Sequence, residues 1–371
     1  MPTQTRAPGG PAPDAADRQL ARHAYTRHFT ELAKTVRESG LLRRRYGYYW
    51  MRMSLVALAL IATGVGVALV GDSWFQLVLA GVLAVVLAQV LFLGHDAAHR
   101  QIFQSSTANE WAGLVIGPLI AGLSMGWWQN KHSRHHAQPN KHGSDPDVAP
   151  GPVAFTPYAR AQRKGIGAYL ADKQGWFFFP LLTLQGLNMH VNSVRRLFGR
   201  AKNRYRIWEI AFLVVRFTAY GGGLLLVMSP AKAAAFIGVQ MAVFGVYMGT
   251  VFATNHVAMP IVPPDMKIDF LRRQVLMSRN VRGGRFVSFL MGGLNHQIEH
   301  HLFPTMPQPN LRKVQPLVRR LCDEHGINYT EVTLFGAYRT ILGYLNNVGP
   351  RGVDPFGCPL AAQLRAPVRA V

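Results

Sequence analysis

The sequence contains very little cysteine. Its 371 residues include only Cys322 and Cys358, and neither belongs to a Cys-x-x-Cys pair. This scarcity argues against a thiolate metal site and against a disulfide framework. Two ordinary thiols instead suit a chain whose polar parts face a reducing cytosol.

Acidic residues are also scarce, at 18 Asp and Glu against 40 Lys and Arg, which gives a formal net charge of +22. Such an excess of positive charge indicates an anionic partner: a nucleic acid, an anionic membrane surface or a phosphate-bearing substrate. Hydrophobic residues make up 49% of the chain and gather in long runs. These runs favour the lipid bilayer, whose cytoplasmic face attracts basic segments, and we expect no nucleic-acid partner.

Four of the apolar runs are long enough to cross a bilayer, which takes about 20 residues. They are residues 51–70, 74–94, 207–228 and 233–259. Short connections join the first run to the second and the third to the fourth. The sequence therefore predicts an all-α integral membrane protein with four transmembrane helices in two hairpins. Arg216, near the middle of the third run, is costly in lipid and is expected to face protein, water or a headgroup.

Two weaker apolar stretches, residues 111–128 and 175–189, are interpreted as interfacial or half-buried helices. The alternative is six spans, and either even number keeps both termini on one side. Lys and Arg are abundant before the first span, in residues 195–206 and after the fourth span, whereas the hairpin tips hold only Lys232. The positive-inside rule then places both termini, the long loops and the active site on the cytoplasmic side.

The ends of the chain differ from its middle in composition. Residues 1–45 are expected to form a cytosolic, partly disordered tail, and residues 350–371 a disordered one. Residues 46–349 between them are predicted to be one domain. After Phe303, apolar residues recur at helical spacing, which predicts a helical cap on the cytosolic side of the membrane.

Histidine is concentrated in three short motifs: HDAAH at 95–99, HSRHH at 132–136 and QIEHH at 297–301. Positions i, i+3 and i+4 of a helix share one face, so each motif directs its ligands to one side. His256 lies at the cytoplasmic end of the fourth span. Imidazole suits iron, zinc and copper, and a single zinc ion needs only three or four ligands. So many histidines on one face therefore suit two metal ions.

In this order and beside paired spans, the three motifs resemble the histidine boxes of the membrane fatty acid desaturase family. The resemblance continues in Asn140 and in Asp145-Pro146-Asp147, and in NHQIEHHLFP at 295–304, which are similar to the linoleoyl-CoA and front-end branch. It covers roughly residues 46–349. It implies a four-span helical fold, a cytosolic di-iron site, and O₂-dependent desaturation of a fatty acyl chain carried by CoA or by a lipid.

The resemblance also implies the iron ligands, which are His95, His99, His132, His135, His136, His300 and His301. His256 resembles the additional histidine that desaturases supply from the last span. Gln297 stands where other branches have a histidine, and its role is open. Either its amide oxygen or an intervening water contacts the metal, or His296 binds in its place because it lies four residues before His300.

Four acidic residues near the boxes are Asp96, Asp145, Asp147 and Glu299. Each either orients a ligand by accepting an imidazole N–H or is a solvated surface acid. We expect no catalytic side chain beyond the metal centre. Removal of hydrogen from an unactivated CH₂ is beyond any side-chain acid or base and needs metal-bound oxygen chemistry.

Three residues just before the second box are candidates for the mouth of an acyl channel. They are Trp127, Trp128 and Asn130. The alternative for the two tryptophans is that they anchor the chain at the membrane interface.

The implied reaction consumes two electrons, and the sequence has no dinucleotide fingerprint, no cysteine cluster and no cytochrome b5-type haem motif. An external donor, a ferredoxin or cytochrome with its reductase, is therefore expected to dock on the basic cytosolic surface. A histidine-box hydroxylase of a lipid or hydrocarbon is the alternative within the same superfamily. A transporter is disfavoured, because transporter sites lie near the middle of the membrane rather than at its cytoplasmic face.

Overall fold

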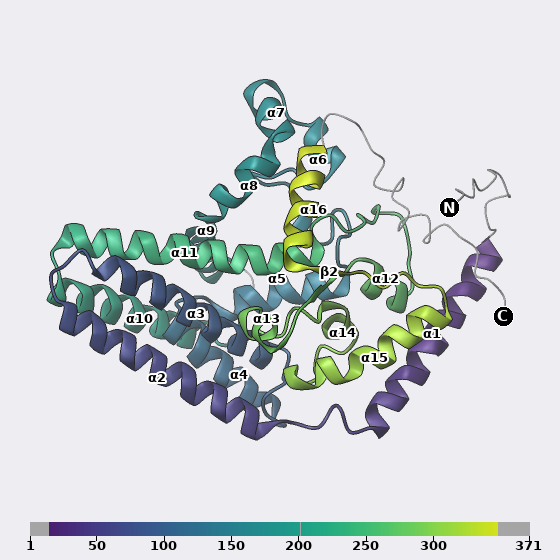
Figure 1. The fold of residues 1–371 in the computed structure, drawn as a ribbon, viewed down its shortest axis with the longest axis horizontal. Helices are drawn as coiled ribbons and strands as arrows, with labels where there is room; N and C mark the ends of the chain where they lie inside the picture. Colours follow the sequence, from purple (N-terminus) through teal and green to yellow (C-terminus); the bar gives the residue numbers. More distant parts are fainter. Residues whose placement is uncertain (1–14, 201, 348–371) are drawn as a thin grey trace.

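The computed structural model describes residues 15–200 and 202–347. Four long apolar helices form an elongated bundle at one end, and α1 (Ala15–Glu38) gathers with shorter helices toward the other end as a cap (Figure 1). The long helices are α2 (Tyr46–Val70), α3 (Gln76–Ala98), α10 (Arg206–Val227) and α11 (Pro230–His256). Each is long and apolar enough to cross a membrane. The four apolar helices predicted from the sequence are thus confirmed, with ends that differ by a few residues.

The α2–α3 turn and the α10–α11 turn meet at one end of the bundle. Asp72, in the turn between α2 and α3, accepts a hydrogen bond of 2.8 Å from the backbone N–H of Ser229 and lies 3.0 Å from the Nζ of Lys232. Both contacts, that with Ser229 first, hold the pKa of Asp72 below its usual value. The α2–α3 turn and the α10–α11 turn are therefore linked to each other, which the sequence did not indicate.

A broken helix follows α3 and carries the second histidine motif. It consists of α4 (Ser106–Leu114), the π-helical η1 (Val115–Ala121) and α5 (Met125–Ala137), with a bend of 114° before α5. Gly122 adopts a φ of 79° at the bend, a left-handed conformation that favours glycine. The stretch 111–128, which was predicted to be an interfacial or half-buried helix, is divided by this bend.

The start of α5 is fixed by polar contacts with two other helices. Ser124 caps α5 by accepting a hydrogen bond from the N–H of Trp127, and it donates its own hydroxyl to Glu209 of α10. Glu209 also accepts the N–H of Gly126 at 2.8 Å, and Ser193 accepts the N–H of Ser124 at 2.6 Å. These contacts explain a buried glutamate in an apolar span, and they set the direction in which α5 leaves the bend.

The remaining elements surround these helices. Before the bundle lies α1 (Ala15–Glu38), and between α5 and α10 lie η2 (Pro146–Val148), α6 (Pro157–Ala161), α7 (Gly165–Asp172), α8 (Gln174–Leu182) and α9 (Gln185–Leu197). After α11 come α12 (Phe270–Leu276), β1 (Asn280–Arg282), α13 (Arg285–Leu290), α14 (Gln297–Leu302), α15 (Gln308–Glu324), β2 (Glu331–Thr333) and α16 (Leu334–Asn347). The strands β1 and β2 pair in parallel, with Val281 opposite Val332. Apart from this small sheet, the regular elements of the described residues are helices, which is consistent with the all-α prediction.

The cap has its own hydrophobic core, formed mainly by α1, α12, α14 and α15. Helices α15 and α16 lie where the sequence predicted helical spacing after Phe303. Within the segment 1–45, which was predicted to be partly disordered, residues 15–38 form α1. Residues 1–14 and the predicted tail at 350–371 lie outside the described residues.

Candidate metal centre

Four separate elements bring the histidine motifs together. His95 lies near the end of α3 and His99 directly follows that helix, while α5 supplies His132, His135 and His136. Helix α11 ends at His256, and α14 carries the third motif. Each set is attached to the end of a helix whose packing is fixed elsewhere, so side chains far apart in the sequence meet between the bundle and the cap.

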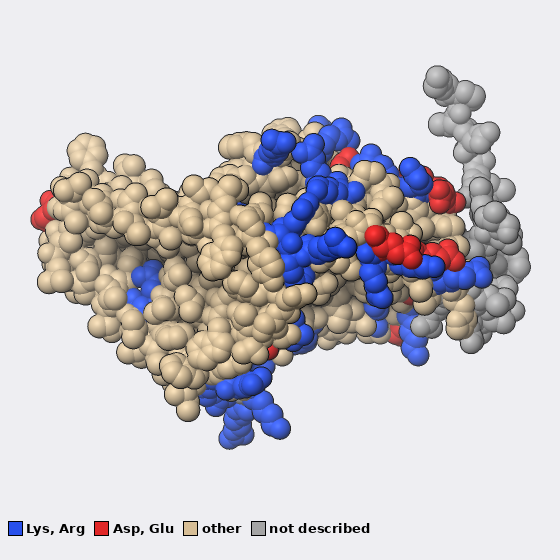
Figure 2. Space-filling view, turned by 90° about the horizontal axis from the view of Figure 1, so that it is seen from below, with Lys and Arg blue, Asp and Glu red and all other residues tan. Residues whose placement is uncertain are grey.

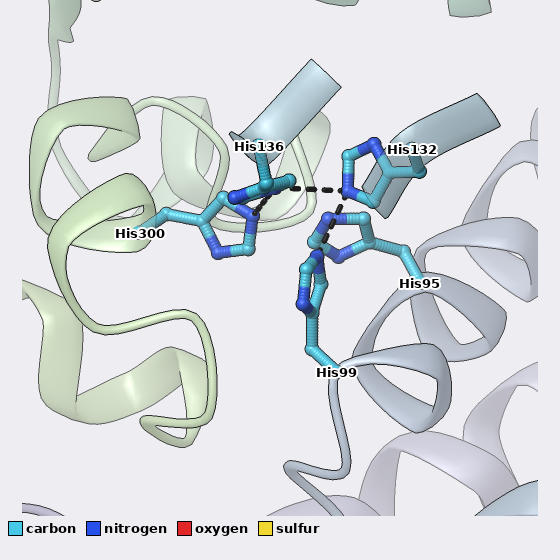
Figure 3. Close-up of side chains that lie close together, drawn as sticks. All are labelled: His95, His99, His132, His136 and His300. Carbon is cyan, nitrogen blue, oxygen red and sulfur yellow. Dashed lines mark hydrogen bonds between the residues drawn. The ribbon is translucent and has the colours of Figure 1, made fainter. Parts of the chain in front are cut away.

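The first group contains five histidines that point toward one another (Figure 3). They are His95, His99, His132, His136 and His300, and their ligand atoms all lie within 4.8 Å of one another. The Nε2 of His132 is 2.8 Å from that of His99 and 3.1 Å from that of His136, which in turn is 3.1 Å from that of His300.

The second group contains His135, His256 and His301, again within 4.8 Å of one another. The Nε2 atoms of His135 and His256 are 3.2 Å apart. Gln297 joins this group, because its side-chain amide lies 2.9 Å from the Nε2 of His256. The structure thus brings together all eight predicted histidines, and it divides them into two adjacent groups.

Burial keeps most of these imidazoles neutral. It lowers the pKa of His99, His132, His136, His300 and His301 well below the usual value, and the neighbouring histidines lower it further. A neutral imidazole offers a lone pair, which is the form that binds a metal. The environment therefore favours the ligating form of these side chains.

The nitrogen atoms of both groups fit bound cations. Within the described residues, the buried Nε2 atoms of His95 and His301 have no hydrogen-bond partner. Buried polar atoms are almost always paired, so such exceptions indicate a missing partner. Several Nε2 atoms also face each other at about 3 Å, where a positive ion between their lone pairs would replace repulsion by ligation. The donor set, mostly imidazole, suits iron.

Two of the predicted acidic residues orient His135. Burial alone would lower the pKa of His135, but Asp145 and Asp147 outweigh it and raise that pKa. The Nδ1 of His135 lies 2.9 Å from Asp145 and 3.4 Å from Asp147. Asp96 similarly lies 3.3 Å from the Nδ1 of His95. In each case a carboxylate beside Nδ1 leaves Nε2 directed into the site.

Two other predicted residues lie outside both groups. Glu299 is fully buried but accepts hydrogen bonds from Tyr329 at 2.6 Å and from Asn280 at 2.7 Å. These partners do not support the prediction that it orients a ligand. Burial raises its pKa to about 7. His296 is buried, belongs to neither histidine group, and has no partner for either ring nitrogen among the described residues.

Sequence reasoning missed Gln274 of α12. Its Oε1 accepts a hydrogen bond of 2.9 Å from the Nδ1 of His301, and its Nε2 donates one of 3.0 Å to the carbonyl of His136. The side chain therefore holds one residue of each histidine group in place. No motif surrounds Gln274 in the sequence, and only the packing of α12 against α14 shows its role.

An apolar cavity adjoins the first group. Its lining includes Phe92, His95, Trp127, Trp128, Met248 and Leu294. The two tryptophans therefore lie where an acyl channel was predicted, whereas Asn130 is exposed and does not line the cavity. Because His95 belongs to both the cavity wall and the first histidine group, an apolar chain in the cavity would lie beside that group.

Comparison with known proteins gives one consistent result. The model of the fatty acid desaturase family matches residues 72–333. The Delta(6)-fatty-acid desaturase fat-3 of Caenorhabditis elegans is 30% identical over 336 residues, which cover 86% of this chain and 74% of the relative.

Two further relatives agree with this assignment. The Delta(8)-fatty-acid desaturase of Helianthus annuus is 25% identical over 352 residues, which cover 89% of this chain and 74% of that protein. Fatty acid desaturase 3 of Bos taurus is 29% identical over 338 residues, with 86% and 72% covered. With helices that can span a membrane, converging histidine boxes and these matches, the chain belongs to the fatty acid desaturase family of oxidoreductases.

Proposed function

We propose that this chain introduces a double bond into a fatty acyl chain, with O₂ as oxidant and two iron ions held by the box histidines, His256 and Gln297. The observation that carries this proposal is a pair of adjacent histidine groups, the first of which lies directly beside an apolar cavity. Bound iron would supply the oxygen chemistry that removes hydrogen from an unactivated CH₂. The protein supplies ligands, their orientation and a place for the acyl chain.

Gln297 is the better candidate than His296 for the remaining ligand. A half-turn of a glutamine amide exchanges its oxygen and nitrogen at nearly the same positions. Turned in this way, Oε1 of Gln297 would point toward the second histidine group beside His256. At present the Nδ2 of Asn255 donates a hydrogen bond of 3.0 Å to the Oε1 of Gln297. The Asn255 amide would have to turn as well, so that its Oδ1 accepts from the Nε2 of Gln297. His296, by contrast, is directed at neither group.

The cavity suits the hydrocarbon tail of the substrate. Its walls come from α3, η1, α5, α9, α11 and Leu294, and they are almost wholly apolar apart from His95 and Ser124. Trp128 stacks on His132 with ring centroids 4.8 Å apart, so the cavity wall and the metal site share a rigid contact. Such a wall would hold one segment of the acyl chain beside the first group and exclude water there.

The orientation of the chain in the membrane is inferred from the four apolar helices and from the distribution of Lys and Arg. We infer that α2–α3 and α10–α11 are two transmembrane hairpins within one domain at residues 46–349, and that the cap, the site and both termini are cytosolic. Basic side chains gather over the cap, whereas the end formed by the long helices carries little charge on the face shown in Figure 2. By the positive-inside rule, the basic cap end is expected to lie on the cytosolic side.

Electrons would come from a separate acidic protein, a ferredoxin or a cytochrome with its reductase. Exposed basic residues of the cytosolic segments offer complementary charge, and they include Arg195, Arg200, Lys202, Arg204, Arg312, Lys313 and Arg320. Charge complementarity of this kind speeds encounter and selects the partner.

Two measurements test the proposed function together. Fatty acid profiles of a host with and without the chain should differ by a new unsaturated product, and the purified protein should hold about two iron ions. A hydroxylated product would assign the hydroxylase alternative. Zinc alone in active protein would contradict the di-iron centre.

A further inference from the structure

The segment at residues 283–294, which we call the α13 segment, lies at the boundary between the long helices and the cap (Figure 1). Its helix α13 has an outer face with Phe286, 71% exposed, and Phe289, 54% exposed. On the inner side, Val287 packs against the core cluster that includes Phe92 and Leu294. Large exposed aromatic side chains on a short helix indicate a surface that contacts something apolar.

Hydrogen bonds from α3 and α11 fix how far along these two helices the α13 segment lies. The carbonyl of Phe289 accepts a bond of 3.3 Å from Gln89 of α3, and that of Leu290 accepts one of 2.7 Å from Tyr247 of α11. Gln89 and Tyr247 also bond to each other at 2.9 Å. Gln89 precedes the metal-site end of α3 by six residues, or about 9 Å at 1.5 Å per residue. The α13 segment therefore lies beside the apolar part of the spans rather than above it.

The charges of this segment suit an anionic lipid surface. It contains no acidic residue, and Arg285 at the start of α13 is exposed. Arg282, just before the segment, is exposed as well and lies 3.6 Å from Glu331. Basic side chains beside exposed aromatic ones are typical of helices that lie in a membrane interface.

The same segment forms a wall of the apolar cavity. Leu294 lines the cavity together with Phe92 of α3 and Met248 of α11. The backbone at Gly292 lies so close to the ring of Phe92 that an added Cβ would be 2.2 Å from its Cγ. Gly292 and Gly293 have φ values of 58° and 81°, which favour glycine. Glycine pairs thus flank α13 on both sides, at 283–284 and at 292–293.

We propose that the α13 segment is a bilayer-immersed wall of the cavity and a lateral opening, through which the acyl chain of a membrane-dissolved lipid enters between α3 and α11. This inference rests on the proposed function for the identity of the cavity. It assigns a substrate class, an acyl lipid that remains in the bilayer rather than a water-soluble thioester. Gln89 and Tyr247 would hold the closed position.

The first experiment measures the position of α13 and needs no activity. A bimane label on Phe286→Cys, in vesicles of phosphatidylcholine and phosphatidylglycerol, should be quenched by lipids with brominated acyl chains and little by aqueous iodide. The control is Arg320→Cys on the exposed side of α15 in the cap, where the opposite is expected. Both variants also carry Cys358→Ser. Equal iodide quenching at the two positions would overturn the proposal.

The second experiment measures how fast the acyl chain of a lipid enters the cavity, and it needs no turnover. A phosphatidylcholine with a diazirine in its acyl chain is mixed into the vesicles, and the peptides captured on irradiation are identified by mass spectrometry. Capture by α3 and α11 should slow about tenfold in Phe286→Arg/Phe289→Arg, because arginine is costly at hydrocarbon depth. The matched Phe286→Leu/Phe289→Leu variant should capture at the parental rate.

The outcomes separate this inference from the proposed function. Unchanged capture in the arginine variant, or capture only from a diazirine acyl-CoA supplied in water, would contradict the lateral opening. A parental protein that captures the lipid in its cavity but never yields an unsaturated product would instead contradict the desaturase activity.

Discussion

His132, His135 and His136 follow one another on α5, yet they serve different groups. His132 and His136 point to the first group and His135 to the second. Two acidic residues beside the ring of His135, and the Gln274 amide beside the ring of His301, keep these two rings in orientations that the backbone alone does not fix. At the scale of single residues, the site depends on side chains that have no metal-binding chemistry of their own.

Exchange of Gln297 tests the remaining ligand position. Gln297→Ala should lower the iron content from about two ions per chain toward one, because the second group loses a donor. Gln297→His should retain the iron, since imidazole is a ligand at least as good. The control is His296→Ala, which should keep both the metal and the activity. Metal analysis of the purified variants gives the result, and loss of iron in His296→Ala alone would reverse the assignment.

Replacement of Gln274 removes the hydrogen-bond acceptor of His301 and leaves every proposed ligand in place. It should therefore weaken metal binding. Gln274→Leu is expected to lower metal affinity by about 10–100-fold, the usual effect of losing a partner that orients a ligand. Gln274→Glu keeps an oxygen for the Nδ1 of His301 and should retain most of the affinity. Iron retention during titration with a chelator measures the difference. Equal retention in both variants would show that His301 is oriented by packing alone.

Close backbone contacts at two glycines fix how α8 and α9 pack against α11. Gly245 of α11 approaches the backbone at the end of α8 so closely that an added Cβ would lie 2.4 Å from the carbonyl oxygen of Leu182. Gly186 of α9 approaches Met241 in the same way, at 2.3 Å from its carbonyl oxygen. Small residues of this kind allow helices to pack at short distance within membranes.

Gly245→Ala should therefore destabilise the protein, by about 1–3 kcal/mol for an overpacked contact. Gly238→Ala in the same helix is the matched control. No atom lies within 4 Å of its added Cβ, and replacing a helical glycine favours the folded state by about 0.5–1 kcal/mol. Thermal unfolding in detergent should show opposite shifts of the midpoint. A similar midpoint for the two variants would mean that α9 moves away from α11 at little cost.

The whole molecule separates an apolar bundle from a basic cap, and the site lies between them. The linked turns at Asp72 and Lys232 mark the far end of the bundle. If the proposed function is correct, this separation would give the protein one end for lipid and another for the soluble electron donor.

The direction of the chain in the membrane can be measured directly. A cysteine at Ser73 should react with an impermeant thiol reagent only from outside the cell, whereas a cysteine at Thr35 of α1 should react only after the membrane is opened. The positive-inside distribution of Lys and Arg is the reason for this expectation. The reverse labelling pattern would move the metal site to the outer face.

Electron delivery should depend on salt. Turnover with NAD(P)H, O₂ and an acyl substrate should need an added ferredoxin and reductase, and it should fall as ionic strength rises. Exposed charges are screened beyond about 8 Å at physiological salt, so a charge-steered encounter slows. Turnover by this chain alone would reveal an overlooked redox cofactor. Salt-independent turnover, with electron delivery limiting, would remove the basic surface as the docking face.

The sequence alone was sufficient to predict the four apolar helices, because about 20 apolar residues can cross a bilayer whatever surrounds them. It also revealed the box histidines, because ligands at i, i+3 and i+4 share a face of any helix. The spacing could not show how these histidines divide into two groups. That division depends on the angle at which α5 leaves the bend at Gly122, and Glu209 and Ser193 fix it from distant parts of the chain. Gln274, the link between Asp72 and Lys232, and the position of α13 beside the spans likewise arise only from tertiary contacts, since each joins residues that no local pattern relates.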